Sequence, residues 1–98
     1  MSRLLTDEEI QRQLQDLQTW TYADGVLRRS VEFTDFPTAL RGVVDVGEEA
    51  ETMDHHPDMD IRWRTVHFTL STHSAGGVTQ LDIELAHRID RIVTSLGS

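Results

Sequence analysis

The sequence predicts a single α+β domain in which helices cover one face of an antiparallel sheet. Helical patterns alternate with segments rich in β-branched and aromatic residues, in the order helix, two strands, helix, strand or strand pair, helix. Asp24–Gly25, between the first two extended segments, is typical of a tight hairpin turn and therefore of antiparallel pairing. With 98 residues, 38% of them hydrophobic and 27% charged, the chain can bury one modest core and is too apolar to be disordered.

The first helix is expected to begin after Thr6. Thr6 and Glu9 have the spacing of a capping box, in which each side chain accepts a hydrogen bond from the other residue's backbone N–H. Ile10, Leu14 and Leu17 follow at helical spacing and predict a narrow apolar stripe.

Two antiparallel strands are expected at residues 20–22 and 26–33, on either side of the Asp24–Gly25 turn. Leu27, Val31 and Phe33 would face the core on alternate positions, with Arg29 as an imperfect member of that face.

The second helix can be capped by Thr34 or Asp35, and Pro37 is compatible with its first turn. It should end at or near His56, because Pro57 disfavours the helical conformation of the residue before it. Its apolar side is expected to consist of Phe36, Leu40, Val43, Val44, Gly47, Ala50 and Met53.

The last third of the chain combines an extended segment, a loop and a helix. Residues 61–72 read as extended, and residues 74–77 as a flexible loop. Thr79 and Asp82 form a second capping box with Asp in place of the usual Glu, which favours a structural role for Asp82. The helix then has an apolar stripe made by Leu81, Leu85, Ile89, Ile92, Val93 and Leu96.

Four of the five histidines lie within about a quarter of the chain. If the extended segment folds back beside the end of the second helix, His55, His56 and His73 can share one pocket. The negative end of the helix dipole, with Asp54 and Asp58, would favour the positively charged imidazolium form. Imidazoles that exchange protons near neutral pH are the usual groups of general acid–base catalysis.

Other interpretations of the histidines are also open. The adjacent pair could only stabilise an exposed helix end through its charge. A metal site is the weaker interpretation, because neighbouring helical residues point about 100° apart, the chain has no Cys, and no HExxH spacing occurs. His67 and His87 are expected to be isolated surface or core residues.

One set of spacings carries a family resemblance. Five residues separate Pro57 from Trp63, nine separate Trp63 from His73, and eight separate His73 from Asp82. Together with His55 and His56, this pattern resembles the signature of the pterin-4a-carbinolamine dehydratase family. The resemblance also runs through Glu51, residues 69–73 and the last helix, and so covers nearly the whole chain as one domain, 1–98.

The resemblance implies a particular version of the fold. The sheet would have four antiparallel strands with three helices packed on one face, in the order α-β-β-α-β-β-α. Residues 61–72 would then contain a hairpin bending around Arg64–Thr65, where relatives often carry Asn. Trp63 is expected in the core or at an interface.

The resemblance also implies an activity and a site. The reaction is the dehydration of 4a-hydroxytetrahydrobiopterin to quinonoid dihydrobiopterin, the tetrahydropterin recycling step after aromatic amino acid hydroxylation, with no metal, nucleotide or redox cofactor. His55 and His73 would be the acid–base pair, and His56 would orient the substrate or share a proton role. Candidate substrate-binding residues are Glu51, Asp54, Pro57, Ser71, Thr72 and Ser74. Glu51 lies one turn before His55 and within reach of it, although a solvated glutamate fits equally well.

An alternative is a non-catalytic binding module, since members of this fold family also act as dimerisation partners of transcription factors. A homodimer or homotetramer is expected in either case, because a small open sheet leaves edges that need cover. The net charge of −8 argues against direct binding of nucleic acid. The chain has no apolar run long enough to cross a membrane, and its first nine residues lack the apolar centre of a signal peptide, so a cytoplasmic protein is expected.

Overall fold

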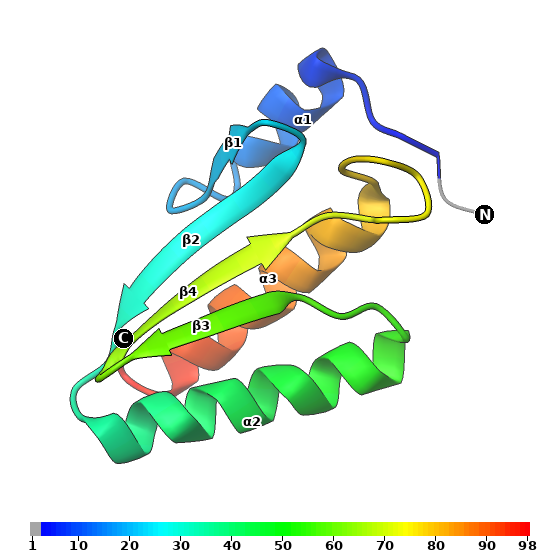
Figure 1. The fold of residues 1–98 in the computed structure, drawn as a ribbon. Helices are drawn as coiled ribbons and strands as arrows, with labels where there is room; N and C mark the ends of the chain where they lie inside the picture. The colour runs from blue at the N-terminus through cyan, green and yellow to red at the C-terminus, as the bar shows by residue number, and fades with distance from the viewer. Residues whose placement is uncertain (1–2) are drawn as a thin grey trace.

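The computed structural model describes residues 3–98, which form a four-stranded antiparallel sheet and three α-helices (Figure 1). In chain order the elements are α1 (Asp7–Leu14), β1 (Thr21–Ala23), β2 (Val26–Glu32), α2 (Phe36–Met53), β3 (Asp58–Arg62), β4 (Thr65–Leu70) and α3 (Gln80–Ser95). The strands lie in the order β1-β2-β4-β3. The expected α-β-β-α-β-β-α fold is confirmed.

The core lies on one face of the sheet. In the register of β2 and β4, Leu27 is opposite Leu70 and Val31 is opposite Val66, and all four side chains are buried. All three helices contribute buried residues to the same apolar cluster. The alternate strand positions, such as Ser30, point to the other face, which is polar.

Arg29 shares the inner face with these apolar residues, and an ion pair explains its presence there. Its Nη1 lies 2.5 Å from Oδ1 of Asp90 on α3, and the same carboxylate oxygen accepts a hydrogen bond from Trp20 Nε1 at 2.8 Å. The aliphatic part of Arg29 can therefore pack inside while its charged end is neutralised.

The local signals of the N-terminal half are confirmed. Thr6 N–H donates to Glu9 at 2.8 Å and Glu9 N–H donates to Thr6 Oγ1 at 3.1 Å, so the capping box is closed. Asp24 and Gly25 both have positive φ, 54° and 76°, as a two-residue turn between twisted strands requires.

The buried side of α2 differs from the one expected. Phe36, Leu40 and Val44 are 43%, 44% and 59% exposed. The buried residues of the helix are Ala39, Gly42, Val46 and Ala50. Small side chains face the core here because the helix approaches closely: a Cβ on Gly42 would lie 2.8 Å from Cζ of Phe33. The expected apolar side was therefore wrong in part.

The turn between β3 and β4 lies one residue earlier than expected. It consists of Trp63 and Arg64, and the positive φ, 54°, falls on Trp63. Trp63 is 71% exposed, so it is not part of the core of this chain. Its ring lies against the guanidinium of Arg64, with 4.8 Å from Cζ to the ring centroid.

The loop after β4, which the sequence predicts as flexible, contains a hydrogen-bonded turn. Thr72 C=O accepts hydrogen bonds from Ala75 N–H and Gly76 N–H at 3.0 and 2.9 Å, and Thr72 N–H donates to Gly77 C=O at 2.8 Å. Gly76 has φ 78°, which a side chain would strain. None of the helices described between residues 3 and 98 is long and apolar enough to cross a membrane.

Candidate active site

One end of the molecule brings together the end of α2, the start of β3, the end of β4 and the start of α3 (Figure 1). The register of the β3–β4 hairpin explains this meeting. Asp58, at the start of β3, pairs with Thr69, near the end of β4, so the segment before β3 and the segment after β4 lie at the same end of the hairpin. The hairpin thus brings the segment between α2 and β3 close to the segment between β4 and α3.

A cavity of about 350 Å³ opens at this point. Its lining residues are Asp54, His55, His56, Pro57, Asp58, Ser71, Thr72, His73 and Ser74. The three histidines singled out from the sequence therefore share one cavity, together with every expected substrate-binding residue except Glu51.

The histidine pair follows α2 rather than lying within it. The helix ends at Met53, not at or near His56 as predicted. Asp54 takes the left-handed conformation (φ 50°), Asp54 N–H donates to Glu51 C=O at 3.2 Å, and His55 N–H donates to Ala50 C=O at 3.1 Å. These two hydrogen bonds form a Schellman motif, which closes the helix before Pro57 can influence it.

His55 is buried, with 9% of its surface exposed. Its Nε2 lies 2.6 Å from Oδ1 of Asp82, in the first turn of α3. The Schellman motif holds the backbone of His55 and Asp82 contacts its ring, so both the position and the orientation of the imidazole are set.

Asp82 caps α3, as its capping box predicts, and it also contacts the imidazole of His55, which was not predicted from the sequence. It is fully buried, and its Oδ2 accepts a hydrogen bond from Thr79 N–H at 2.9 Å, which confirms the cap. The same oxygen accepts a hydrogen bond from Thr72 Oγ1 at 2.8 Å, while Oδ1 faces His55. The signal available in the sequence was the place of Asp82 in the family signature.

His56 and Glu51 form a second imidazole–carboxylate contact, on the surface. His56 Nε2 lies 2.5 Å from Glu51 Oε2, and both side chains are more than half exposed. The spacing allowed either a contact of Glu51 with His55 or a solvated Glu51. The contact with His55 is not formed, because the chain leaves the helix at Asp54, which brings His56 over Glu51 and turns His55 inward, and the Glu51 side chain is largely exposed.

His73 also lines the cavity, from the turn after β4, and its side chain is exposed. The cavity thus combines three imidazoles with the carboxylates of Asp54 and Asp58 and with serine hydroxyls. Such a lining can donate and accept hydrogen bonds and protons. Among residues 3–98, no group of three or more His, Asp or Glu side chains is arranged to hold a metal ion.

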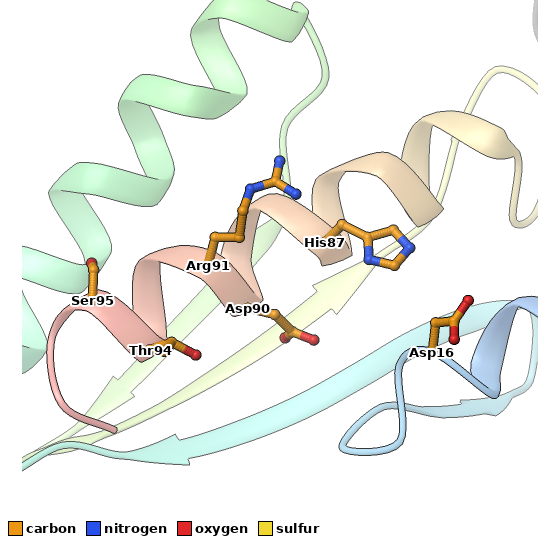
Figure 2. Close-up of a pocket in the computed structure, with 6 residues that line it drawn as sticks. All are labelled: Asp16, His87, Asp90, Arg91, Thr94 and Ser95. Carbon is orange, nitrogen blue, oxygen red and sulfur yellow. The ribbon is translucent and has the colours of Figure 1, made fainter.

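A second hollow, of about 400 Å³, lies between α3 and the segment after α1 (Figure 2). Its lining residues are Asp16, His87, Asp90, Arg91, Thr94 and Ser95. The Asp90 carboxylate is already engaged by Trp20 and Arg29. With a single histidine, and with one of its two carboxylates already paired, this hollow is a poorer candidate for proton transfer than the cavity at His55.

The fold and the cavity define a small α+β protein with a histidine-lined cleft suited to proton transfer. The chain belongs to the pterin 4 alpha carbinolamine dehydratase family, whose sequence profile matches residues 3–92.

Similar proteins agree with this assignment. The chain is 54% identical over 92 residues to a Mycobacterium avium protein named "Putative pterin-4-alpha-carbinolamine dehydratase", with 94% of this chain and 98% of the relative covered. A Mycobacterium tuberculosis protein of the same name is 53% identical over 87 residues, covering 89% and 93% of the two chains.

Two solved structures share the fold. A Brucella melitensis protein described as a transcriptional coactivator/pterin dehydratase superposes with a TM-score of 0.88 at 37% identity, covering 91% of this chain and 97% of the other. A pterin dehydratase-like protein identified as a RuBisCO assembly factor gives a TM-score of 0.62 at 16% identity, covering 76% and 86%. The second likeness concerns the fold alone.

Proposed function

We propose that this protein dehydrates 4a-hydroxytetrahydrobiopterin to quinonoid dihydrobiopterin. The observation that carries the proposal is the meeting of His55, His56 and His73 in one cavity of about 350 Å³, in a chain of this family. A cavity of this size suits a small fused-ring substrate.

The chemistry needs two proton transfers. The N5 lone pair of the pterin helps to expel the 4a-hydroxyl group as the C4a–N5 double bond forms. One group must protonate the departing oxygen, which leaves as water, and another must accept the N5 proton. Each such transfer by a placed side chain typically contributes ~10²–10⁴-fold to the rate.

The roles proposed for the histidines follow their places in the cavity. His55, from the segment after α2, and His73, from the turn after β4, act as the acid–base pair, and His56 orients the substrate or shares a proton role. Asp54, Pro57, Ser71 and Ser74 form the hydrogen-bonding and packing walls, and Glu51 acts through His56. The Thr72 hydroxyl already donates to Asp82, so Thr72 contributes by holding that carboxylate.

The test is an assay with freshly generated 4a-carbinolamine. His55→Ala and His73→Ala should each slow the dehydration by about 10²–10⁴-fold and leave the circular dichroism spectrum unchanged. His67→Ala is the matched control, because His67 lies on the outer face of the sheet and contacts Ser30. Full activity in both cavity variants would end the proposal. Full inhibition by a chelator would instead favour a metal-binding module.

A non-catalytic binding role is the second candidate, and one observation favours it. Phe36, Leu40 and Val44 form an exposed apolar row along α2, which a second protein chain could cover.

We propose that the protein is a homodimer or homotetramer, and that this row is where copies meet. Sedimentation of the wild type and of Val44→Glu tests this, since the substitution should lower the oligomer mass. A wild-type monomer would contradict it.

A further inference from the structure

The carboxylate of Asp82 connects both walls of the candidate active site to α3. It is fully buried; its Oδ2 accepts from Thr79 N–H and Thr72 Oγ1, and its Oδ1 lies 2.6 Å from His55 Nε2. A helix cap needs only the hydrogen bond from Thr79 N–H. The contact with His55 uses the other oxygen and is not explained by capping.

The direction of the hydrogen bonds around Asp82 follows from the donors. The Thr72 hydroxyl has one hydrogen and gives it to Asp82, so the Thr79 hydroxyl, 2.7 Å away, donates to Thr72. The chain of hydroxyl groups therefore points toward the carboxylate. Since an ionised carboxylate only accepts hydrogen bonds, the ring nitrogen of His55 at Oδ1 carries a hydrogen.

The other ring nitrogen of His55 is available to a substrate. Within residues 3–98 His55 Nδ1 has no hydrogen-bond partner, and the only fully buried side-chain nitrogen or oxygen there without a partner is Nε of Arg64. Nδ1 is therefore reached by solvent, although His55 as a whole is buried, and His55 lines the cavity. In a neutral imidazole with hydrogen on Nε2, Nδ1 is the proton acceptor.

We propose that Asp82 is a positioning residue that holds neutral His55 in the Nε2–H tautomer, so that Nδ1 is the nitrogen that exchanges a proton in the cavity. The catalytic part of this inference rests on the proposed dehydratase function. The tautomer itself does not depend on any activity.

Asp82→Asn separates positioning from capping. The amide oxygen can take the place of Oδ2 and still accept from Thr79 N–H and Thr72 Oγ1. The amide NH₂ group then faces His55 and donates to Nε2, which forces the hydrogen of the imidazole to Nδ1 and removes the acceptor from the cavity. The helix cap is kept while the tautomer is reversed.

The first measurement is nitrogen NMR of the protein with ¹⁵N-labelled histidine, followed to the alkaline end of a titration. The wild type should show His55 with hydrogen on Nε2, and Asp82→Asn should show it on Nδ1. Hydrogen on Nδ1 in the wild type, or the same tautomer in both proteins, overturns the proposal. If Asp82→Asn does not fold, the wild-type tautomer decides alone.

The second measurement is the rate of carbinolamine dehydration. Asp82→Asn should lower kcat by about 10²–10⁴-fold with a much smaller change in KM, as expected when a general base loses its correct tautomer. Asp35→Asn is the matched control, because it makes the same change in the carboxylate that caps α2, at the opposite end of that helix from His55. A kcat for Asp82→Asn equal to that of Asp35→Asn overturns the positioning role. An inactive wild type would end the proposed function but leave the NMR test intact.

Discussion

His56 Nε2 lies 2.5 Å from Oε2 of Glu51, five residues earlier in the chain. The spacing is too long for a contact within a regular helix, where residues three or four apart are neighbours. It becomes possible because the Schellman motif at Asp54 turns the chain back over the last turn of α2. The end of this helix therefore determines which histidine meets which acid.

Glu51→Gln should weaken the placement of His56 without unfolding the protein. Both side chains are exposed, so the free energy of unfolding should hardly change, and kcat/KM for carbinolamine should fall by about two- to fivefold. Steady-state kinetics and urea titration measure the two effects. Glu48→Gln, at an exposed position of the same helix, is the control, and equal kcat/KM in both variants would contradict the prediction.

The left-handed conformation of Asp54 should respond to the choice of side chain. Asp54→Gly removes the steric cost at φ 50° and should raise the free energy of unfolding by about 0.5–1 kcal/mol. Asp54→Val places a β-branched residue there and should lower it by about 1–3 kcal/mol. Urea denaturation compares the two variants. A Val variant as stable as the Gly variant would mean that the Schellman motif is not maintained in solution.

The close approach of α2 to the core predicts opposite effects at its two glycines. Gly42→Ala would place Cβ 2.8 Å from the buried ring of Phe33, and should lower the free energy of unfolding by about 1–3 kcal/mol. Gly47→Ala meets nothing within 4 Å and should raise it by about 0.5–1 kcal/mol. Thermal or urea unfolding of the pair checks this, and a change of the same sign in both would count against the packing described.

The N-terminal capping box predicts a pH dependence. Hydrogen bonds from the Arg3 guanidinium and from Thr6 N–H lower the pKa of Glu9 from 4.5 to about 2. Because the folded pKa lies below the unfolded one, the ionised Glu9 stabilises the fold above pH 4.5, and this contribution is lost as the pH falls toward 2.

Glu9→Gln should therefore be less stable than the wild type by a constant amount above about pH 5.5, and the difference should shrink as the pH falls and disappear only as the pH passes below about 2. Urea titrations at a series of pH values measure it. Glu48→Gln serves as the control for the loss of one negative charge. A difference that grows as the pH falls would show that the sign of this linkage is wrong.

Features that depend on a few neighbouring residues could be predicted from the sequence. The capping boxes at Thr6 and Thr79 and the hairpin at Asp24–Gly25 each require only residues within four positions, and the structure confirms all three. The order of helices and strands followed from the same local patterns and from the family resemblance.

Features that depend on competition between distant parts of the chain could not be predicted. The apolar residues of α2 occupy more than one face, so their spacing does not say which row, that of Leu40 or that of Ala39, meets the core. The end of α2 was predicted from Pro57, whereas the helix ends earlier, at the Schellman motif formed by Asp54 and His55.

The candidate site was predicted in part. The meeting of His55 with His73 was expected and is found, whereas the roles of both histidines stay predictions. The contact between His55 and Asp82 was missed because a helix cap alone seemed to explain a carboxylate at that position. Only the three-dimensional structure shows that the second oxygen of Asp82 faces an imidazole.

The length of the two-residue turn at Trp63 and Arg64 determines the register of β3 against β4, and so the geometry of the cavity at the other end of the hairpin. Each residue added there would slide one strand of the hairpin along the other, and a single insertion would also send the inward side chains of β3 to the opposite face. The segment that holds His55 would then be displaced relative to the segment after β4 that holds Thr72 and His73. Substitutions in this exposed turn should therefore be tolerated better than insertions or deletions, which would alter the cavity.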